Sequence, residues 1–327
     1  LDPEKTSVYF QSSRPEVQRL GFTLGRRTNL SELGSIYGFE GNTNLAHVQA
    51  PLVQVGDILH PMLDKFGGLR PVVVPVGVDQ DPHIRLTRDI VSKSQWFNVR
   101  KSKNGGILIS LSIQPENHRA FGVKQNLSVD KSERSKIISK LEHLVSSMGF
   151  SDIQTNPKHG TITIHAGTAH DVNDLRLELC KLERELGGIG LLPPSSSYHK
   201  FAIGLDGGKM SSSKPETTIF LNESIEAMKR KIMKAHSGGK STVEEHRRLG
   251  GDLETDVAFQ YLKFFFEKDD AELTKIAKDY TSGKILAGEM KKLCAQQAEI
   301  WMNELTEKRA QWSDKISDFL ADDAIQS

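Results

Sequence analysis

The clearest hydrophobic pattern in the chain is an unbroken apolar run at Arg70–Val78, with the sequence RPVVVPVGV. Such a run predicts a central strand of a parallel sheet that is covered on both faces. It leads directly into Asp79, Gln80 and Asp81, and then into a predicted helix at Ile84–Val91. A strand whose end begins a helix is the usual place for a ligand crevice in a doubly wound sheet. The pattern therefore predicts an α/β domain with a binding site at this strand end.

The residues before this run predict one strand and three helices. Their ranges are Thr6–Gln11 for a short buried strand, then Pro15–Leu24, Asn29–Tyr37 and Ala46–Leu59 for the helices. Pro15 suits the first turn of a helix, and Thr28 or Asn29 can cap the second helix. In the third helix, Gln54 and Asp57 stand three residues apart and therefore share one face.

Residues 92–192 have a different texture, in which strands and amphipathic helices alternate. The expected strands are Gly106–Ile113 and Thr161–His165, and the expected helices are Lys131–Met148 and Asn173–Leu186. About a hundred residues are enough for a small domain. The pattern thus predicts a separate α/β module, which ends at Pro193 and Pro194.

Beyond Pro215 the chain reads as almost wholly helical, with an apolar spine at Val257–Phe266. The predicted fold class is α/β: a doubly wound, Rossmann-type parallel sheet with an inserted α/β module and a C-terminal all-α domain. The predicted catalytic domain comprises residues 1–92 and 193–214. The insert spans 93–192, and the helical domain spans 215–327.

Composition narrows the class of protein without naming a function. Charged residues make up 26% and hydrophobic residues 37% of the 327 positions, which is a soluble globular balance. The formal net charge is +1, so a nucleic acid would have to be bound by local basic patches. Cys180 and Cys294 lack metal-ligand spacing and predict reduced thiols. With neither a signal peptide nor an apolar run of about 20 residues, we expect a cytoplasmic protein without a membrane partner.

The most specific chemical signal is the loop Gly204–Pro215, with the sequence GLDGGKMSSSKP. Glycines let the backbone bend around a ligand, and amides, hydroxyls and an ammonium are the groups that a triphosphate needs. A Gly/Ser linker is the plain alternative, but a linker does not need the Lys209–Met210 pair. The spacing also differs from that of a Walker loop. The loop resembles the KMSKS signature of class I aminoacyl-tRNA synthetases, with Ser212 in place of the second lysine.

Other segments sharpen this resemblance. The segment Asp79–Asp89 (DQDPHIRLTRD) resembles the DQDP…TRD segment of tryptophanyl-tRNA synthetases, and Pro51-x-x-Gln54-x-x-Asp57 resembles the amino-acid-facing helix of the tryptophan and tyrosine subgroup. The C-terminal segments that resemble the archaeal and eukaryotic tryptophan enzymes are Thr242–Arg247, Gly250–Gly251, Asp256–Phe259, Tyr280–Gly283 and Gly288–Lys292. The match fails only over residues 92–192.

The resemblance implies a tryptophan–tRNA ligase that uses ATP and Mg²⁺ and charges tRNA(Trp), typically as a homodimer. It implies catalytic roles for Lys209, Ser211 and Ser213, and substrate contacts for Gln54, Gln80 and Asp79. The implied ATP contacts are Gly204, Asp206, Gly208, Lys209, Met210, Ser211, Ser212 and Ser213. A tyrosine–tRNA ligase of the same subgroup and a non-catalytic tRNA-binding fragment are the alternatives. Pro82 and Thr87 favour tryptophan.

Several of these residues also have plain structural interpretations. Gln54 and Gln80 can each cap a backbone group. Arg85 and Arg88 can pair on the surface with Asp81 or Asp89, and His83 is expected to be structural. In the insert, Arg100, Lys101 and Lys103 beside Asn104–Gly106 are expected to help tRNA docking; packing against the catalytic domain is the other role considered, and editing is not expected.

The family's HIGH-type motif, expected on the first strand-to-helix turn, has no match around His47, His60 or His83. We therefore expect that this sequence lacks an upstream βα unit. The prediction is that the 327-residue chain fails at tryptophan-dependent ATP–pyrophosphate exchange, because half of the ATP site is missing, and that an upstream segment restores it. Robust exchange by the chain alone would contradict this expectation.

Overall fold

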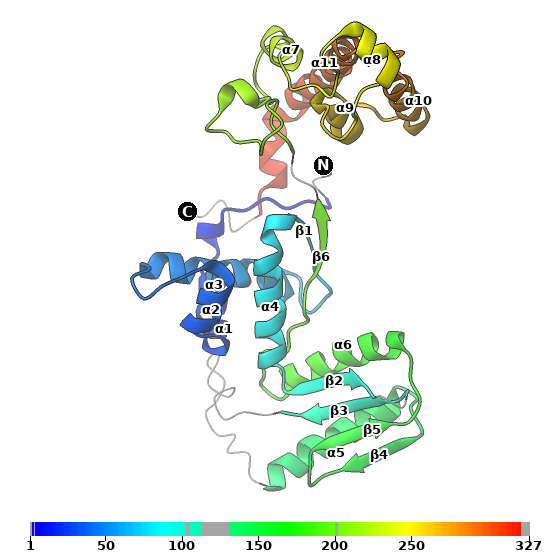
Figure 1. Ribbon diagram of the computed structural model, residues 1–327. Helices are drawn as coiled ribbons and strands as arrows, with labels where there is room; N and C mark the ends of the chain where they lie inside the picture. Colours follow the sequence, from blue (N-terminus) through cyan, green and yellow to red (C-terminus); the bar gives the residue numbers. More distant parts are fainter. Residues whose placement is uncertain (1, 3, 103–104, 113–130, 200–201, 322–327) are drawn as a thin grey trace. The chain divides into compact units, whose positions relative to one another are not determined.

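The computed structural model describes the chain except for residues 1, 3, 103–104, 113–130, 200–201 and 322–327 (Figure 1). The chain divides into two compact units. Tyr9–His199 form the first, which we call the α/β unit. Leu1–Val8 together with Lys200–Ala321 form the second, which we call the helical unit. The three-domain division expected from the sequence stays a prediction.

In the α/β unit, strand β1 (Val73–Gly77) pairs in parallel with β6 (Ser195–His199), from Val73 opposite Ser195 to Gly77 opposite His199. The helices of this part are α1 (Pro15–Leu24), α2 (Leu30–Tyr37), α3 (Leu45–Leu59) and α4 (Asp81–Ser94). All four were expected at nearly these bounds. Pro15 begins α1, and the Asn29 side chain caps α2 by accepting a hydrogen bond from the Glu32 amide at 3.0 Å.

Helices α1 and α3 cross in close contact because two glycines face the crossing. A Cβ atom on Gly56 would lie 2.0 Å from the carbonyl oxygen of Val17, and one on Gly21 would lie 2.3 Å from that of Leu52. No side chain larger than hydrogen fits there without backbone movement. The crossing therefore holds in place the middle of α3, the part of the helix that carries Gln54.

Two strand expectations from the sequence are wrong in their details. β1 was expected to be covered on both faces, but the Val73 side chain is 63% exposed, and β6 is the neighbour of β1 within the described part of the chain. Thr6–Gln11 forms no strand: Val8 makes an isolated bridge to Leu320, and Phe10 is 60% exposed. In both places an apolar, β-branched pattern reports strand propensity, while burial depends on partners that are distant in sequence.

The insert is a four-stranded antiparallel sheet in the order β2-β3-β5-β4, with two helices. The bounds are β2 Phe97–Lys101, β3 Ile107–Leu111, α5 Lys131–Ser147, β4 Ile153–Asn156, β5 Thr161–Ile164 and α6 Ala169–Glu185. Its own core includes the fully buried residues Ile109, Leu141, Ile162 and Leu175. Both expected strands and both helices are present, although residue 113 at the end of the first strand lies outside the described residues. The short strands β2 and β4 were not expected.

One buried carboxylate, that of Glu183 on α6, joins the two ends of the insert. Its Oε2 accepts a hydrogen bond from the Trp96 amide at 2.9 Å, and its Oε1 accepts one from the Gly190 amide at 3.1 Å. The side chain of Gln95 also donates to the Leu191 carbonyl at 3.1 Å. Glu183 is only 2% exposed, and this burial raises its pKa to about 7, against the two amide hydrogen bonds that lower it.

The helical unit contains α7 (Ile225–Met233), α8 (Val243–Leu249), α9 (Val257–Tyr261), α10 (Asp270–Thr281) and α11 (Ala287–Trp312). A π-helical turn at Leu262–Phe266 continues α9, so the expected apolar spine is confirmed as part of the core. In the same unit, the fully buried carboxylate of Asp256 accepts hydrogen bonds from the Phe259 and Gly238 amides, both at 3.0 Å, and from the Tyr280 hydroxyl at 2.6 Å.

Both cysteines are buried free thiols, as the sequence predicted, with Cys180 in the α/β unit and Cys294 in the helical unit. Burial raises the pKa of each to about 12, so neither thiol ionises at neutral pH. Among the residues that the structure describes, no helix is long and apolar enough to cross a membrane.

The raised pKa of Glu183 predicts a pH-dependent stability of the α/β unit. The folded carboxyl titrates near pH 7 and the unfolded one near 4.5, so between these values the folded chain binds more protons. Stability from this group is therefore present below about pH 4.5 and is lost as the pH rises through 7. Urea unfolding at pH 5 and pH 8 should show a loss on the order of 2 to 3 kcal/mol from this group.

Glu183→Gln should flatten this pH dependence, because an amide does not titrate. The matched control is Glu178→Gln on the same helix, where the carboxylate is partly exposed and pairs with Lys181 at 2.6 Å. An unchanged pH slope in Glu183→Gln would show that another group causes the effect.

Candidate functional site

The signature loop of the helical unit is a tight glycine turn. The Gly204 amide donates to the Gly208 carbonyl at 2.7 Å, and the Gly207 amide donates to the Gly204 carbonyl at 2.8 Å. Gly207 has a φ of +83°, in the left-handed region that favours glycine. The bridge between Ile203 and Lys209 closes the turn and carries Lys209 on its outgoing arm.

The base of this loop is fixed in the core of the helical unit. Leu205 is 4% exposed; its amide donates to the Thr217 carbonyl at 2.8 Å, and its carbonyl accepts from the His236 amide at 2.7 Å. The buried Tyr261 hydroxyl donates to the Ile203 carbonyl at 2.7 Å, and burial raises the pKa of Tyr261. The turn therefore presents an exposed tip, Asp206–Lys209, on an immobilised base.

The serines after Lys209 lie at the surface of the same loop. Ser211 and Ser213 share a hydrogen bond of 2.8 Å between their hydroxyl oxygens. The Thr218 hydroxyl fixes the backbone below them by donating to the Ser211 carbonyl at 2.8 Å. Every residue for which the resemblance implies an ATP contact therefore lies on this one loop, and the structure brings together the groups that bind phosphates: hydroxyls, glycine amides and an ammonium.

In the α/β unit, the two glutamines singled out from the sequence are in contact. Gln54 on α3 donates from Nε2 to Oε1 of Gln80 at 3.1 Å, and both side chains are half-buried. In this arrangement the side-chain oxygen of Gln54 remains available to accept a hydrogen bond, and the side-chain NH2 group of Gln80 remains available to donate one. An acceptor for an ammonium beside a donor for a carboxylate is what the common part of an amino acid requires. Asp79, the residue before Gln80, is exposed.

The charged residues around α4 have structural partners. Arg85 pairs with Asp81 at 2.5 Å, as its surface interpretation predicted. Arg88 differs from the expectation: its Nε donates to the Pro194 carbonyl at 2.8 Å and its Nη2 to the Ser196 hydroxyl at 2.9 Å. Because these groups precede and begin β6, Arg88 fixes that strand against α4.

His83 is held by a tyrosine, as expected for a structural residue. Its Nδ1 lies 2.8 Å from the Tyr37 hydroxyl. Burial lowers the pKa of His83, which Asp79 partly opposes, and burial raises the pKa of Tyr37 to about 12. A neutral histidine is therefore favoured near neutral pH.

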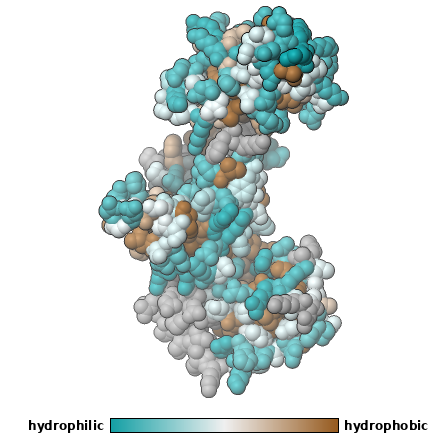
Figure 2. Space-filling view, viewed as in Figure 1, coloured by the Kyte–Doolittle hydropathy of each residue, from teal (hydrophilic) through white to brown (hydrophobic). Residues whose placement is uncertain are grey.

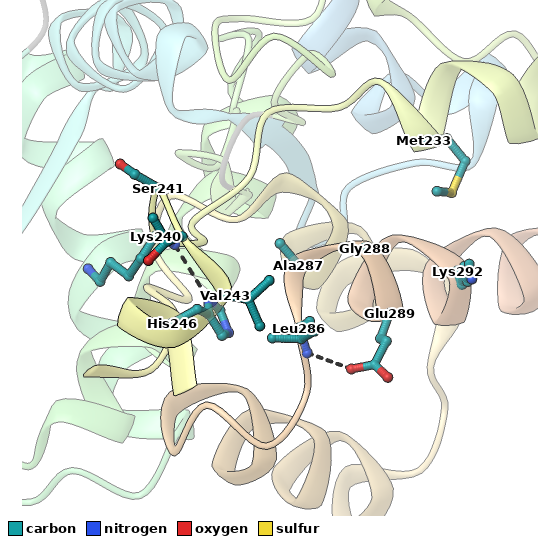
Figure 3. A pocket seen from close by; sticks show the side chains of 11 residues that line it. Met233, Lys240, Ser241, Val243, His246, Leu286, Ala287, Gly288, Glu289 and Lys292 are labelled. Atoms are coloured by element: carbon teal, nitrogen blue, oxygen red, sulfur yellow. Dashed lines mark hydrogen bonds between the residues drawn. The ribbon is translucent and has the colours of Figure 1, made fainter. Parts of the chain in front are cut away.

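The helical unit also contains a cavity that was not predicted from the sequence. It has a volume of about 370 Å³ and lies between α8 and the start of α11. Lys240 and Lys292 lie on its wall, together with the first residues of α11 (Figure 3). Buried His246 is fixed there, because its Nδ1 accepts from the Lys240 amide at 3.4 Å and its Nε2 donates to the Ile285 carbonyl at 2.9 Å. Its lining residues extend from Met233 to Lys292, 59 positions apart, so only the fold reveals the cavity.

Comparison with known proteins identifies the family to which this chain is similar. The family "tRNA synthetases class I (W and Y)" matches residues 1–108 and 172–303. The gap between the two ranges lies inside the insert. The tryptophan–tRNA ligase of Thermoplasma volcanium is 36% identical over 310 residues, which are 95% of this chain and 68% of that protein. The enzyme of Archaeoglobus fulgidus is 37% identical over 305 residues, which are 93% of this chain and 65% of that protein.

A solved structure supports the fold class. The crystal structure of tryptophanyl-tRNA synthetase from Aeropyrum pernix K1 matches with a TM-score of 0.64 and 28% identity, covering 98% of this chain and 62% of that one. The expected α/β class with a C-terminal helical region is thereby confirmed. The chain spans about two thirds of the length of these relatives. It belongs to the class I tRNA synthetases for tryptophan and tyrosine.

Proposed function

We propose that this chain carries amino-acid-binding residues and the signature-loop part of the ATP site of a tryptophan–tRNA ligase. The observation that supports this most strongly is the Gln54–Gln80 contact, because it presents an acceptor and a donor side by side at the end of β1. That is the ligand position expected of such a sheet. The relatives named above are tryptophan–tRNA ligases, which favours tryptophan over tyrosine as the substrate.

In the proposed reaction, the tryptophan carboxylate attacks the α-phosphate of ATP in line. One P–O bond forms, the bond to the bridging oxygen breaks, and pyrophosphate leaves with that electron pair. Gln54 accepts a hydrogen bond from the α-ammonium, and Gln80 donates one to the carboxylate and so orients the nucleophile. Asp79, beside Gln80, adds a negative charge near the ammonium.

Lys209 stabilises the charge that develops on the phosphates, and the hydroxyls of Ser211 and Ser213 donate to phosphate oxygens. The glycine amides of the loop approach the nucleotide because no side chain intervenes. Mg²⁺ bound to the ATP substrate would supply positive charge against the leaving pyrophosphate. A ribose hydroxyl of tRNA(Trp) then attacks the carbonyl carbon of the adenylate, so that an ester bond to the tryptophanyl group forms and AMP leaves.

We propose that the cavity beside α8 and α11 contacts the tRNA. Its two lysines suit phosphate, and a volume of about 370 Å³ is large enough for a nucleobase. In the insert, Arg100 and Lys101 lie at the end of strand β2, paired with Leu108 and Ile107, and not in the expected turn; Lys103 and Asn104 lie outside the described residues.

A homodimer and a cytoplasmic location are further proposals. Phe22 on α1 and Leu45 on α3 are 77% and 83% exposed, and hydrophobic residues gather over the α1–α3 region of the surface (Figure 2). Exposed apolar side chains of this size are typical of protein interfaces. Sedimentation analysis of the chain tests the dimer.

The function is tested by tryptophan-dependent ATP–pyrophosphate exchange. It is measured for the chain alone and for a chimera in which the N-terminal part of the Thermoplasma volcanium enzyme precedes it. In the chimera, Lys209→Ala should slow exchange by about 10²–10³-fold with little change in tryptophan affinity, because the charge acts on the transition state. A loss below about threefold would remove Lys209 from the mechanism, and tRNA binding without any exchange would favour the non-catalytic alternative.

Gln54→Ala should instead raise the KM for tryptophan by about 10-fold or more, because a hydrogen bond to a charged group is worth about 1.5–3 kcal/mol. The kcat should change much less. Gln18→Ala, at an exposed position on α1, is the matched control. An unchanged KM in Gln54→Ala would give this residue a purely structural role.

A further inference from the structure

The tip of the signature loop contains an ion pair that the proposed mechanism does not use. The carboxylate of Asp206 accepts a hydrogen bond from the Gly208 amide at 3.0 Å through Oδ1. Its Oδ2 lies 3.7 Å from Nζ of Lys214, eight positions further along the chain. One carboxylate thus gathers an amide donor and an ammonium.

Two backbone turns bring these groups together. The glycine turn closed between Gly204 and Gly208 presents Asp206 at its tip. The second turn is closed by the Lys214 amide, which donates to the Ser211 carbonyl at 3.0 Å, and by the Thr217 amide, which donates to the Lys214 carbonyl at 3.1 Å. Since both ends are held by backbone hydrogen bonds, the meeting of Asp206 and Lys214 is built into the loop.

The donors on Asp206 are those that a phosphate oxygen would also take. A glycine amide and a lysine ammonium are typical partners of phosphate groups. A phosphate can also readily replace Asp206 as the partner of Lys214, because the Lys214 and Asp206 side chains are 58% and 37% exposed. Exposed ion pairs contribute little stability, about 0–1 kcal/mol. A triphosphate, with several negative charges, competes well against a single exposed carboxylate.

We infer that Lys214 is a second phosphate-binding lysine of this loop and that Asp206 is an internal competitor that holds it until the nucleotide binds. The inference rests on the proposed function, because it names a further residue for the same ATP. Between Gly204 and Pro215 the charged side chains are Asp206, Lys209 and Lys214. While Asp206 neutralises Lys214, the loop offers one net positive charge from Lys209. When phosphate displaces Asp206, it meets two ammonium groups and the Gly208 amide.

The test measures equilibrium binding of tripolyphosphate and of Mg·ATP to the 327-residue chain by calorimetry. Asp206→Asn should tighten tripolyphosphate binding about 3- to 10-fold, because the amide no longer competes for the ammonium. Lys214→Ala should weaken it about 10-fold and should reduce its salt dependence. In the double variant, most of the gain from Asp206→Asn should disappear, because the part that comes from releasing the ammonium requires Lys214.

Lys268 and Glu304 provide a matched control, since they form an exposed ion pair in the same unit at 3.0 Å. Lys268→Ala and Glu304→Gln should leave binding unchanged. Weaker binding in Asp206→Asn would overturn the inference, because it would make Asp206 a ligand of the nucleotide's metal rather than a competitor. An undiminished gain without Lys214, or tripolyphosphate that fails to bind the unaltered chain at millimolar concentration, would also overturn it.

The proposed function fails separately. If Lys209→Ala leaves exchange unchanged in the chimera, the loop has no role in activation, whatever the ion pair does. If Lys209→Ala impairs ATP–pyrophosphate exchange while the Asp206 and Lys214 variants bind tripolyphosphate normally, the proposed function stands. Only the inferred move of Lys214 from Asp206 to phosphate is then excluded.

Discussion

The chemistry of this chain depends on one leucine, Leu205, being buried inside an otherwise polar loop. Its side chain anchors the turn in the helical core, while its amide and carbonyl are satisfied by Thr217 and His236. A loop of glycines and serines alone would lose much conformational entropy on binding a ligand. With its base already fixed, only the tip has to adjust. For the proposed nucleotide site, the helical core thus lowers the entropic cost of binding, although the core residues do not contact the nucleotide.

The α/β unit solves a similar problem by helix packing. Gly21 and Gly56 let α1 and α3 approach until backbone meets backbone. Arg88 fixes the start of β6 against α4 through a carbonyl and a hydroxyl. Gln54 lies on α3 and Gln80 at the N-cap of α4, so each belongs to one of these packed helices. Two flexible side chains can hold a 3.1 Å contact because their backbones are fixed by this packing.

The sequence predicted whatever is encoded locally. Helix bounds followed from caps such as Asn29 and from Pro15, and the glycine-lysine loop followed from its composition. What it could not predict depends on distant partners: the exposure of Val73, the single bridge of Val8, and the contact of Arg88 with residues more than a hundred positions away. Short strands such as Ile153–Asn156 were missed because four residues, of which only Ile153 is apolar, are too few to show an alternation of apolar and polar positions. The pairing of Asp206 with Lys214 was missed because charge alternation says nothing about turn geometry.

The insert shows how a large addition can leave the strand pairing beside the proposed ligand site undisturbed. Its two ends meet on the carboxylate of Glu183, and Gln95 reaches across to Leu191. For the pairing of β1 with β6, the insert of about a hundred residues is therefore equivalent to a short connection, because its two ends lie together. The family match fits this arrangement, because it stops at residue 108 and resumes at 172, leaving the joined ends within matched sequence. Sequence inside the insert is free to differ, provided that it builds its own core and returns a carboxylate to the junction.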